Sequence, residues 1–356
     1  MDEKPLKIRS ILEESIKVKG SDVFIVPGAK CSIKINGVIT PYSDEVIKRD
    51  LSSLLIGEVY TLSGRSMDIL DSEGDDDFSF SIPEVGRFRC NAFRQRNSLA
   101  MVLRVVDFNL PNPKLIGIPD TIIDFYQEKN GLILVTGPAG SGKSTTLACI
   151  IDRINHEKID HIITIEDPIE FIHRHDKSIV SQREIAHDTK NYETALRAAL
   201  REAPDVILLG EMRDHETIAT ALTATETGHL VFSSLHTIGA AKTIDRIIDV
   251  FSPNQQQQVR VQLSMVLKAV VSQQLLPDKN GKLIPAFEIM KITPAISNLI
   301  REGKTYQIDN VIYSSKELGM NTMDSDILRL YQEGKITKEV AMMYAVNPSN
   351  IQEKLK

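Results

Sequence analysis

The first part of the chain alternates apolar and polar side chains with a period of two, after one stretch with helical spacing. Residues 8–19 carry isoleucine and leucine at helical intervals and end at Gly20, so we predict a helix there. Alternating runs between glycine and proline turns then predict strands at residues 22–26, 32–39, 77–82, 87–93 and 99–106. Together these elements indicate a small α+β domain.

After the proline-rich and glycine-rich segment 110–119 the pattern changes to short, continuous apolar runs that alternate with helical stretches. Such runs are typical of buried strands in a mostly parallel sheet that lies between helices, an α/β arrangement. They fall at residues 132–136, 161–165, 205–210 and 230–234. Short amphipathic helices are expected after about residue 290.

The two patterns predict four parts of the chain. They are an N-terminal domain of residues 1–108, a linker of residues 109–119, an α/β core of residues 120–290 and a C-terminal helical region of residues 291–356. The acidic run from Asp71 to Asp77 precedes a predicted strand, and we interpret it as a solvated loop rather than a cation site.

Composition excludes several classes of protein. The chain has 356 residues, 42% of them hydrophobic, and a net charge of −6, which argues against a strongly basic nucleic-acid binder. No apolar run is long enough to span a membrane, and the charged N-terminus lacks the core of a signal peptide, so we expect a cytoplasmic protein. Three scattered cysteines indicate neither a disulfide framework nor a zinc site, and we interpret them as reduced, mostly packed residues.

The most specific chemical signal is a complete phosphate-binding loop between a predicted strand and a predicted helix. Glycines let the backbone turn its N–H groups toward phosphate oxygens, at the helix end that favours negative charge. Lys143 is then expected to reach the β- and γ-phosphates of ATP, and Ser144 to bind Mg²⁺. The nucleotide-binding candidates are Gly137, Pro138, Ala139, Gly140, Ser141, Gly142, Lys143, Ser144 and Thr145.

Two glutamates follow apolar strands and are therefore expected at the same edge of the sheet as this loop. Glu211 ends the run 204–210, and Glu166 ends the run before the acidic segment 166–170. Each could activate the attacking water or hold the metal through water, and the motifs do not settle which glutamate does which. The plainer alternatives are a helix-capping glutamate at 211 and an ordinary turn at 166.

Two histidines flank the predicted strand 230–234. His236 follows the strand at the end expected to face the phosphates, where an imidazole can sense the γ-phosphate, and His229 precedes it. Both are candidates for a catalytic role, although a single histidine more often has a structural one.

Five arginines cluster in the last strands of the N-terminal domain, with few acids among them: Arg87, Arg89, Arg94, Arg96 and Arg104. If this domain covers the ATP of a neighbouring subunit, some of them can act in trans on the phosphates. The alternative is surface charge or pairing with the acidic run, which we expect for at least two of the five.

Five motifs in this order resemble those of the PilT-type ATPases of the secretion ATPase superfamily, the hexameric motors that retract type IV pili. The resemblance covers nearly the whole chain and rests on GPAGSGKST, TIEDPIEFIH, PDVILLGEMRD, TGHLVFSSLHT and TPAISNLIREGKTYQI. It implies a PAS-like N-terminal domain and a RecA-like ATPase domain. It also implies catalytic roles for Glu166, Glu211, His229 and His236, and roles in trans for Arg89 and Arg104.

The same resemblance favours a retraction motor over an extension or type II secretion ATPase, because those relatives usually carry a long extra N-terminal region and a four-cysteine insertion. Two positions depart from the retraction pattern. Ser297 stands where the family's late motif has its first arginine, and the segment from Ser21 to Val26 differs from the usual S-D-L-H-L. The first departure bears on retraction rather than on ATP hydrolysis.

The resemblance implies a homohexamer that binds MgATP between subunits and acts on an inner-membrane platform protein, with a paralogous pilus ATPase as a further partner. Its place would be the inner face of the cell membrane, at the pilus base. A regulatory module that hydrolyses slowly is the alternative of another class, and the intact Lys143, Glu166, Glu211 and His236 argue against it. A RecA-type nucleic-acid translocase would need a basic pore loop, which the sequence does not show.

Overall fold

The computed structural model describes residues 6–106 and 110–354, and the chain divides into two compact units, Met1–Asn109 and Leu110–Lys356. The first residue of the predicted linker, 109, lies outside the described residues. Within the predicted linker, Leu110, Ile116 and Ile118 pack on the hydrophobic core of the second unit. The exact domain boundaries stay a prediction.

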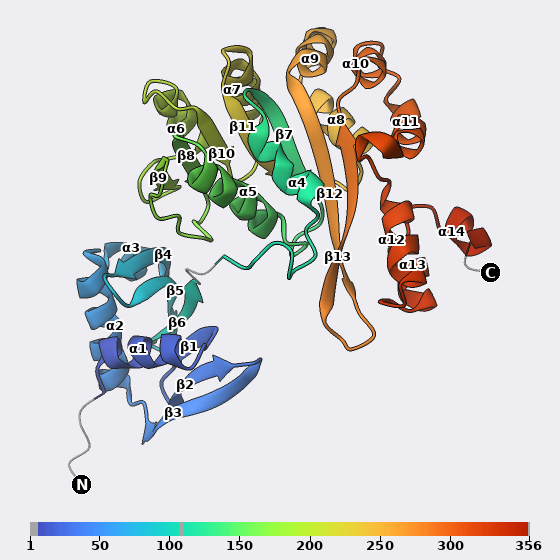
Figure 1. Cartoon of the computed structure of the whole chain (residues 1–356). Coiled ribbons are helices and arrows are strands. Elements are labelled where there is room, and N and C mark those ends of the chain that lie inside the picture. The colour runs from blue at the N-terminus through green and yellow to red at the C-terminus, as the bar shows by residue number, and fades with distance from the viewer. Residues whose placement is uncertain (1–5, 107–109, 355–356) are drawn as a thin grey trace. The chain divides into compact units, whose positions relative to one another are not determined.

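The first unit is an antiparallel sheet with helices on one side of it (Figure 1). Its strands lie in the order β3-β2-β1-β6-β5-β4 and all neighbours are antiparallel. The strands are β1 (Asp22–Ile25), β2 (Lys30–Ile35), β3 (Val38–Val46), β4 (Asp75–Ile82), β5 (Gly86–Gln95) and β6 (Ser98–Val106), and the helices are α1 (Ile8–Lys17), α2 (Arg49–Ser63) and α3 (Asp68–Glu73).

Two predictions for this unit are corrected. The predicted strand 32–39 is two strands, because Asn36 and Gly37 take positive φ and form the turn between β2 and β3. The acidic run is not a solvated loop: its residues end α3 and begin β4, with Gly74 in the left-handed conformation between them. Asp76 is buried, where it accepts hydrogen bonds from Tyr60 and from Nε and Nη2 of Arg65.

The second unit is built on a seven-stranded sheet in the order β13-β12-β7-β11-β10-β8-β9, parallel except for β13 (Figure 1). The strands are β7 (Gly131–Thr136), β8 (His161–Glu166), β9 (Ile179–Glu184), β10 (Val206–Leu209), β11 (Leu230–Leu235), β12 (Leu267–Pro277) and β13 (Leu283–Lys291). The four predicted apolar runs are confirmed as β7, β8, β10 and β11, and they are the central strands, buried on both faces as parallel strands usually are.

Helices cover both faces of this sheet. Alternate residues of β7 belong to two different hydrophobic clusters, one under α5 and the short helices before β7, the other under α6 to α11. The helices are α4 (Asp120–Ile123), the 3-10 turn Asp124–Gln127, α5 (Lys143–Glu157), α6 (Tyr192–Ala199), α7 (His215–Glu226), α8 (Ala240–Asp249), α9 (Pro253–Val266), α10 (Pro294–Arg301) and α11 (Ile308–Ser314).

The C-terminal region is helical, as the amphipathic pattern predicts. After α11 come α12 (Met323–Gln332), α13 (Lys338–Tyr344) and α14 (Pro348–Lys354), which share a small hydrophobic cluster with β12 and β13. Two 3-10 turns, Thr305–Gln307 and Lys316–Leu318, join the helices of this region. Among the described residues, no helix is long and apolar enough to cross a lipid bilayer.

Candidate active site

The phosphate-loop residues lie where β7 ends and α5 begins, beside a cavity of about 240 Å³ in the second unit. Four positions of the predicted loop and helix start line the cavity directly: Ala139, Gly140, Lys143 and Ser144. Gly137 and Gly142 have φ angles of 145° and 86°, which side chains other than glycine rarely adopt. The loop therefore has the backbone that its glycines predict.

Both predicted glutamates lie in the same cavity, since β8 and β10 are neighbouring parallel strands that end at one edge of the sheet. Asp167, Glu170, Tyr192 and Arg213 also line it. The structure thus brings the acidic strand ends and the phosphate loop together.

Lys143, His236 and Glu211 form a connected chain of polar contacts. Lys143 Nζ donates to the carbonyl oxygens of Gly137 and Pro138, both at 3.0 Å, and lies 3.4 Å from His236 Nδ1. Because an ammonium group can only donate, Nδ1 must accept, and the ring proton is therefore on Nε2. From there it donates to Glu211 Oε2 at 3.2 Å. Burial lowers the pKa of Lys143, and the charges of Glu211 and Glu170 oppose this effect.

Glu211 is held from two sides. Its second carboxylate oxygen, Oε1, pairs with Arg213 Nε, and its side chain is only 13% exposed. Two hydrogen-bond partners at the rim of the cavity therefore orient a charged carboxylate toward the loop. The capping alternative is not what the structure shows, because Asp214 is the residue whose side chain caps α7.

Glu166 has a different environment. It is 9% exposed and accepts from Thr164 Oγ1 at 2.7 Å and from Gln182 Nε2 at 3.4 Å. Burial raises the pKa of this carboxyl to about 7, and the hydrogen bond from Thr164 opposes the shift. The two glutamates of the site thus differ: Glu211 is paired with a cation, and Glu166 is buried without one.

The Glu166 environment predicts a pH-dependent stability. A carboxyl that ionises at 4.5 unfolded and near 7 folded destabilises the folded state by about 3 kcal/mol above pH 7, and less as the pH falls toward 4.5. We therefore expect Glu166→Gln to stabilise the nucleotide-free protein at pH 8 and to have little such effect at pH 4.5. Urea unfolding at both pH values measures this, with Glu170→Gln as the control for an exposed carboxylate of the same cavity. Equal stabilisation at both pH values would contradict the prediction.

The other predicted residues lie outside this cavity. His229 sits at the opposite, amino-terminal edge of the parallel strands, where its Nδ1 contacts Ala224 O and Thr227 Oγ1. The structure therefore does not bring His229 to the phosphate loop of its own chain, and it gives the side chain a local structural role.

Arg89 and Arg104 belong to the first unit, on β5 and β6, where they are direct cross-strand neighbours. Each has an acidic partner, Asp77 at 2.6 Å for Arg89 and Asp22 at 3.1 Å for Arg104. Arg94 pairs with Asp71. The expectation that at least two of the five arginines pair with the acidic run is thus confirmed by Arg89 and Arg94.

Two residues near the site are not among the predicted site residues, although His173 ends the motif TIEDPIEFIH. His173 lines the cavity, is 7% exposed, and its Nδ1 has no partner among the residues that the structure describes. Burial lowers its pKa to about 4, so the imidazole is neutral at physiological pH. Gln273 on β12 accepts from Thr146 Oγ1 at 2.7 Å and so fastens the helix that follows the phosphate loop. It lies far along the chain, in a strand that the sequence pattern does not predict.

One buried hydroxyl in the loop fits a nucleotide. Ser141 Oγ has no hydrogen-bond partner in the described part of the chain, although it lies directly under Gly137. An unsatisfied buried hydroxyl is costly, and a phosphate oxygen would satisfy it. Loop, lysine and acidic strand ends at the carboxyl edge of a parallel sheet define a P-loop nucleotide-binding protein.

Comparisons with known proteins identify the family to which this chain belongs. A sequence profile described as "Type II/IV secretion system protein" matches residues 2–341, and the chain belongs to that family. It is 42% identical over 345 residues, covering 97% of this chain and 100% of the relative, to "Type IV pilus retractation ATPase PilT" of Pseudomonas aeruginosa. It is 48% identical over 277 residues to "Twitching motility protein" of Neisseria gonorrhoeae, covering 77% of this chain and 74% of the relative.

The fold agrees with these relatives. The solved "Crystal Structure of the Pilus Retraction Motor PilT and Bound ADP" is 46% identical, with a TM-score of 0.90 over 98% of this chain and 99% of the other. These findings confirm the predicted family, the α/β fold class and the assignment as a nucleotide-binding ATPase, and they agree with the predicted retraction function.

Proposed function

We propose that this ATPase is a homohexameric motor that drives the retraction of type IV pili. The observation that carries the proposal is the connected set Lys143, His236 and Glu211 at a phosphate loop, in a chain that spans the full length of a PilT relative. Its partners are an inner-membrane pilus platform protein and a paralogous pilus ATPase. Its place is the cytoplasmic face of the cell membrane, at the pilus base. No nucleic-acid partner is proposed.

The residues around the cavity fit MgATP. Ser144 is the residue that would bind Mg²⁺, with Glu166 and Glu211 acting through water, and the metal would supply charge neutralisation on the phosphates. Lys143 now satisfies its ammonium with two loop carbonyls, and these bonds can be exchanged for phosphate oxygens when ATP binds. The glycine backbone of the loop supplies the remaining N–H donors.

We assign water activation to Glu211 and metal support to Glu166. Glu211 is ion-paired with Arg213 and connected to His236, so it is a charged carboxylate that can accept a proton from water. Glu166 has a pKa near 7 because it is buried, and an ionised carboxylate there needs a nearby cation. Nucleotide-bound metal is such a cation, so Glu166 fits a supporting role.

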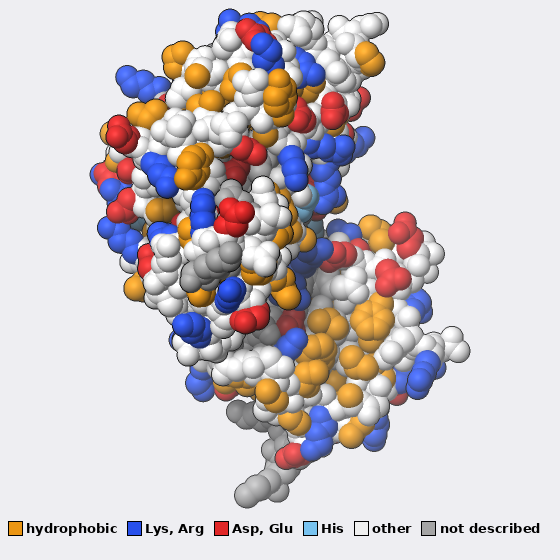
Figure 2. All heavy atoms as spheres, turned by 90° about the vertical axis from the view of Figure 1, so that its right-hand side faces the viewer, with side chains coloured by type: hydrophobic (Ala, Val, Ile, Leu, Met, Phe, Trp, Pro, Cys, Tyr) orange, Lys and Arg blue, Asp and Glu red, His pale blue; other side chains and the backbone are white. Residues whose placement is uncertain are grey.

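A ring is consistent with two features of the first unit. Val38 and Ile39 of the edge strand β3 are 66% and 57% exposed. Figure 2 shows, separately, that hydrophobic side chains gather on part of the face that it draws. A contiguous apolar patch, rather than single exposed apolar residues, marks an interaction surface. Arg89 and Arg104 lie on neighbouring strands of the same unit, and we propose that they complete the ATP site of the next subunit.

The competing secretion function is less well supported. The chain is 33% identical to "Type II secretion system protein E" of Pseudomonas aeruginosa over 254 residues, which cover 68% of this chain but 49% of that relative.

Ser297, the departure from the retraction pattern, donates from its hydroxyl to Ser264 O and so joins α10 to α9. It therefore has a structural partner of its own, away from the ATP cavity.

A strain that makes type IV pili but lacks its retraction ATPase tests the direction of the motor. We expect the wild-type chain to restore pilus retraction and twitching, and Lys143→Ala, which cannot hold the phosphates, to restore neither. The purified wild-type protein should hydrolyse ATP only in assemblies of ring size. No restored retraction in this strain, together with restored pilus assembly in a strain that lacks its extension ATPase instead, would contradict the proposal in favour of an extension ATPase. Full activity of a monomer would contradict the ring.

A further inference from the structure

The strand pair β12–β13, at one edge of the sheet of the second unit, carries buried polar side chains. Ser272, Gln273 and Glu288 are 0%, 3% and 6% exposed, and Ser272 lies directly opposite Glu288 in the antiparallel register. Burying a carboxylate and an amide is costly unless each is hydrogen-bonded. The hydrogen-bond partners of these three side chains therefore show which segments this strand pair holds in place.

Gln273 connects the strand pair to the phosphate loop. Its side-chain oxygen accepts from Thr146 in α5, and its carbonyl oxygen lies so close to Gly137 that a Cβ there would come within 2.1 Å. The backbone of β12 thus lies directly behind the loop.

Ser272 and Glu288 hold the segment that follows His236. Gly239 N donates to Ser272 Oγ at 2.9 Å, and Ala240 N, at the first residue of α8, donates to Glu288 Oε1 at 2.7 Å. Together these two contacts hold the segment that connects His236 to α8.

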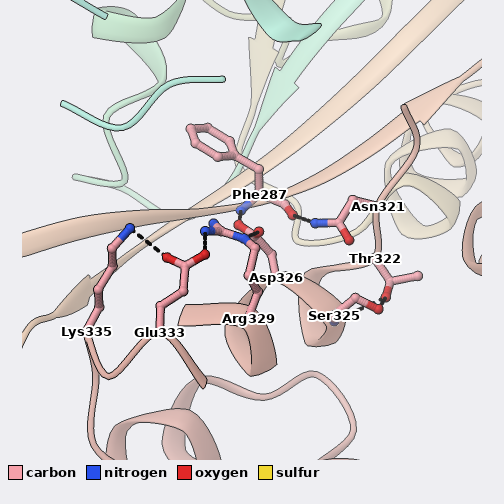
Figure 3. Close-up of polar contacts among 8 residues, drawn as sticks. All are labelled: Phe287, Asn321, Thr322, Ser325, Asp326, Arg329, Glu333 and Lys335. Atoms are coloured by element: carbon pink, nitrogen blue, oxygen red, sulfur yellow. Dashed lines mark hydrogen bonds and ion pairs between the residues drawn. The ribbon is translucent and has the colours of Figure 1, made fainter. Parts of the chain in front are cut away.

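The second oxygen of the same carboxylate faces a different helix. Met323 N, at the first residue of α12, donates to Glu288 Oε2 at 3.3 Å. Phe287, the strand residue next to Glu288, also contacts this region through its backbone. Phe287 N donates to Asp326 Oδ2 at 2.9 Å, and Asn321 Nδ2 donates to Phe287 O at 3.3 Å. Figure 3 shows Phe287, Asn321 and Asp326 joined in this way, with Arg329 paired to Asp326.

We propose that Glu288 is a positioning residue that couples the state of the nucleotide site to the C-terminal helices. One carboxylate bridges the first residues of α8 and α12, and α8 follows the loop of His236. A shift of His236 on ATP hydrolysis that reaches Ala240 is then passed to α12 through the Glu288 carboxylate, or it breaks a buried hydrogen bond. The inference rests on the proposed ATPase function and on the expectation that His236 senses the γ-phosphate, and it adds the route by which that signal reaches α12.

A tryptophan reporter tests the coupling, because the chain contains no tryptophan. Tyr331 lies on α12, half-buried against the cluster of α12–α14, so Tyr331→Trp is a conservative probe. We expect its emission to differ between the ADP-bound protein and the protein bound to a non-hydrolysable ATP analogue, both with Mg²⁺.

Glu288→Gln should abolish that difference. A glutamine offers one acceptor oxygen and one donor NH₂ to two donor amides, so one of the two helix contacts is lost. We expect kcat to fall about tenfold while the affinity for ADP stays within about threefold, because the phosphate loop itself is intact. Ser272→Ala removes only the Gly239 contact and should reduce the emission difference without abolishing it.

The matched control is Asp326→Asn, which weakens the contact between α12 and β13 without touching α8. It should lower the unfolding temperature but keep kcat and the emission difference. The proposal is overturned if Glu288→Gln lowers the unfolding temperature but keeps the wild-type kcat and the emission difference. It is also overturned if the Tyr331→Trp protein with Glu288 intact hydrolyses ATP and shows no emission difference. A chain that shows the emission difference without hydrolysing ATP would contradict the motor function while supporting the coupling.

Discussion

Glu211→Gln is expected to lower kcat for ATP hydrolysis by about 10²–10⁴-fold, the usual contribution of a positioned general base. Glutamine keeps the length of the side chain and can still accept a hydrogen bond from His236, so the shape of the cavity should be retained. What it loses is the negative charge and the capacity to take a proton from water. Steady-state hydrolysis and ADP binding, measured on the same preparation, separate the two effects.

Nucleotide affinity should change little in this variant, because Glu211 contacts Arg213 and His236 rather than the loop itself. Glu216→Gln is the matched control: it removes a carboxylate that is 58% exposed in the first turn of the next helix, and its kcat should stay near wild type. If instead Glu166→Gln shows the larger loss of kcat and Glu211→Gln a small one, the two glutamates have the reverse roles.

The phosphate loop and the acidic strand ends could be predicted from sequence because their signals are local. A glycine pattern fixes the loop, and a glutamate at the end of an apolar strand must come to the carboxyl edge of a parallel sheet. Glu166, Glu211 and His236 each follow such a strand, and the structure places all three around one cavity.

The histidine pair shows the limit of this reasoning. His229 and His236 stand at the two ends of β11, a strand of six residues, so they are separated by roughly 20 Å at the usual rise per residue. A motif that contains both residues does not reveal that only one end of the strand faces the phosphates. The direction of the strand reveals it, because His236 follows the carboxyl end of β11.

The β12–β13 hairpin could not be predicted for a different reason. Its strands carry buried Gln273 and Glu288, which break the apolar pattern typical of a buried strand. Their hydrogen-bond partners, Thr146 and Ala240, are distant in sequence, so only the fold reveals why polar side chains are tolerated there. The same holds for Asp76 in the acidic run, whose burial depends on Arg65.

Arg104→Ala is expected to lower kcat by about 10³–10⁵-fold if the arginine stabilises the transferred phosphate of the neighbouring subunit. Its side chain is 70% exposed and held by one ion pair with Asp22, and an exposed pair of this kind contributes only about 0–1 kcal/mol. The guanidinium can therefore leave Asp22 for a phosphate at small cost. Arg94→Ala, on the neighbouring strand and paired with Asp71, is the matched control and should keep kcat within about threefold of wild type.

Mixing two inactive variants distinguishes action in trans from action within one chain. The Arg104→Ala protein keeps Lys143, and the Lys143→Ala protein keeps Arg104. Together they can form a complete ATP site only if that site uses Lys143 of one subunit and Arg104 of another. We expect each variant alone to be inactive and the mixture to regain part of the wild-type activity, which size-resolved hydrolysis assays measure. If Arg104 serves the ATP of its own chain, every subunit in the mixture still lacks one of the two residues and no activity returns. An Arg104→Ala protein that is active by itself would remove the arginine from the mechanism altogether.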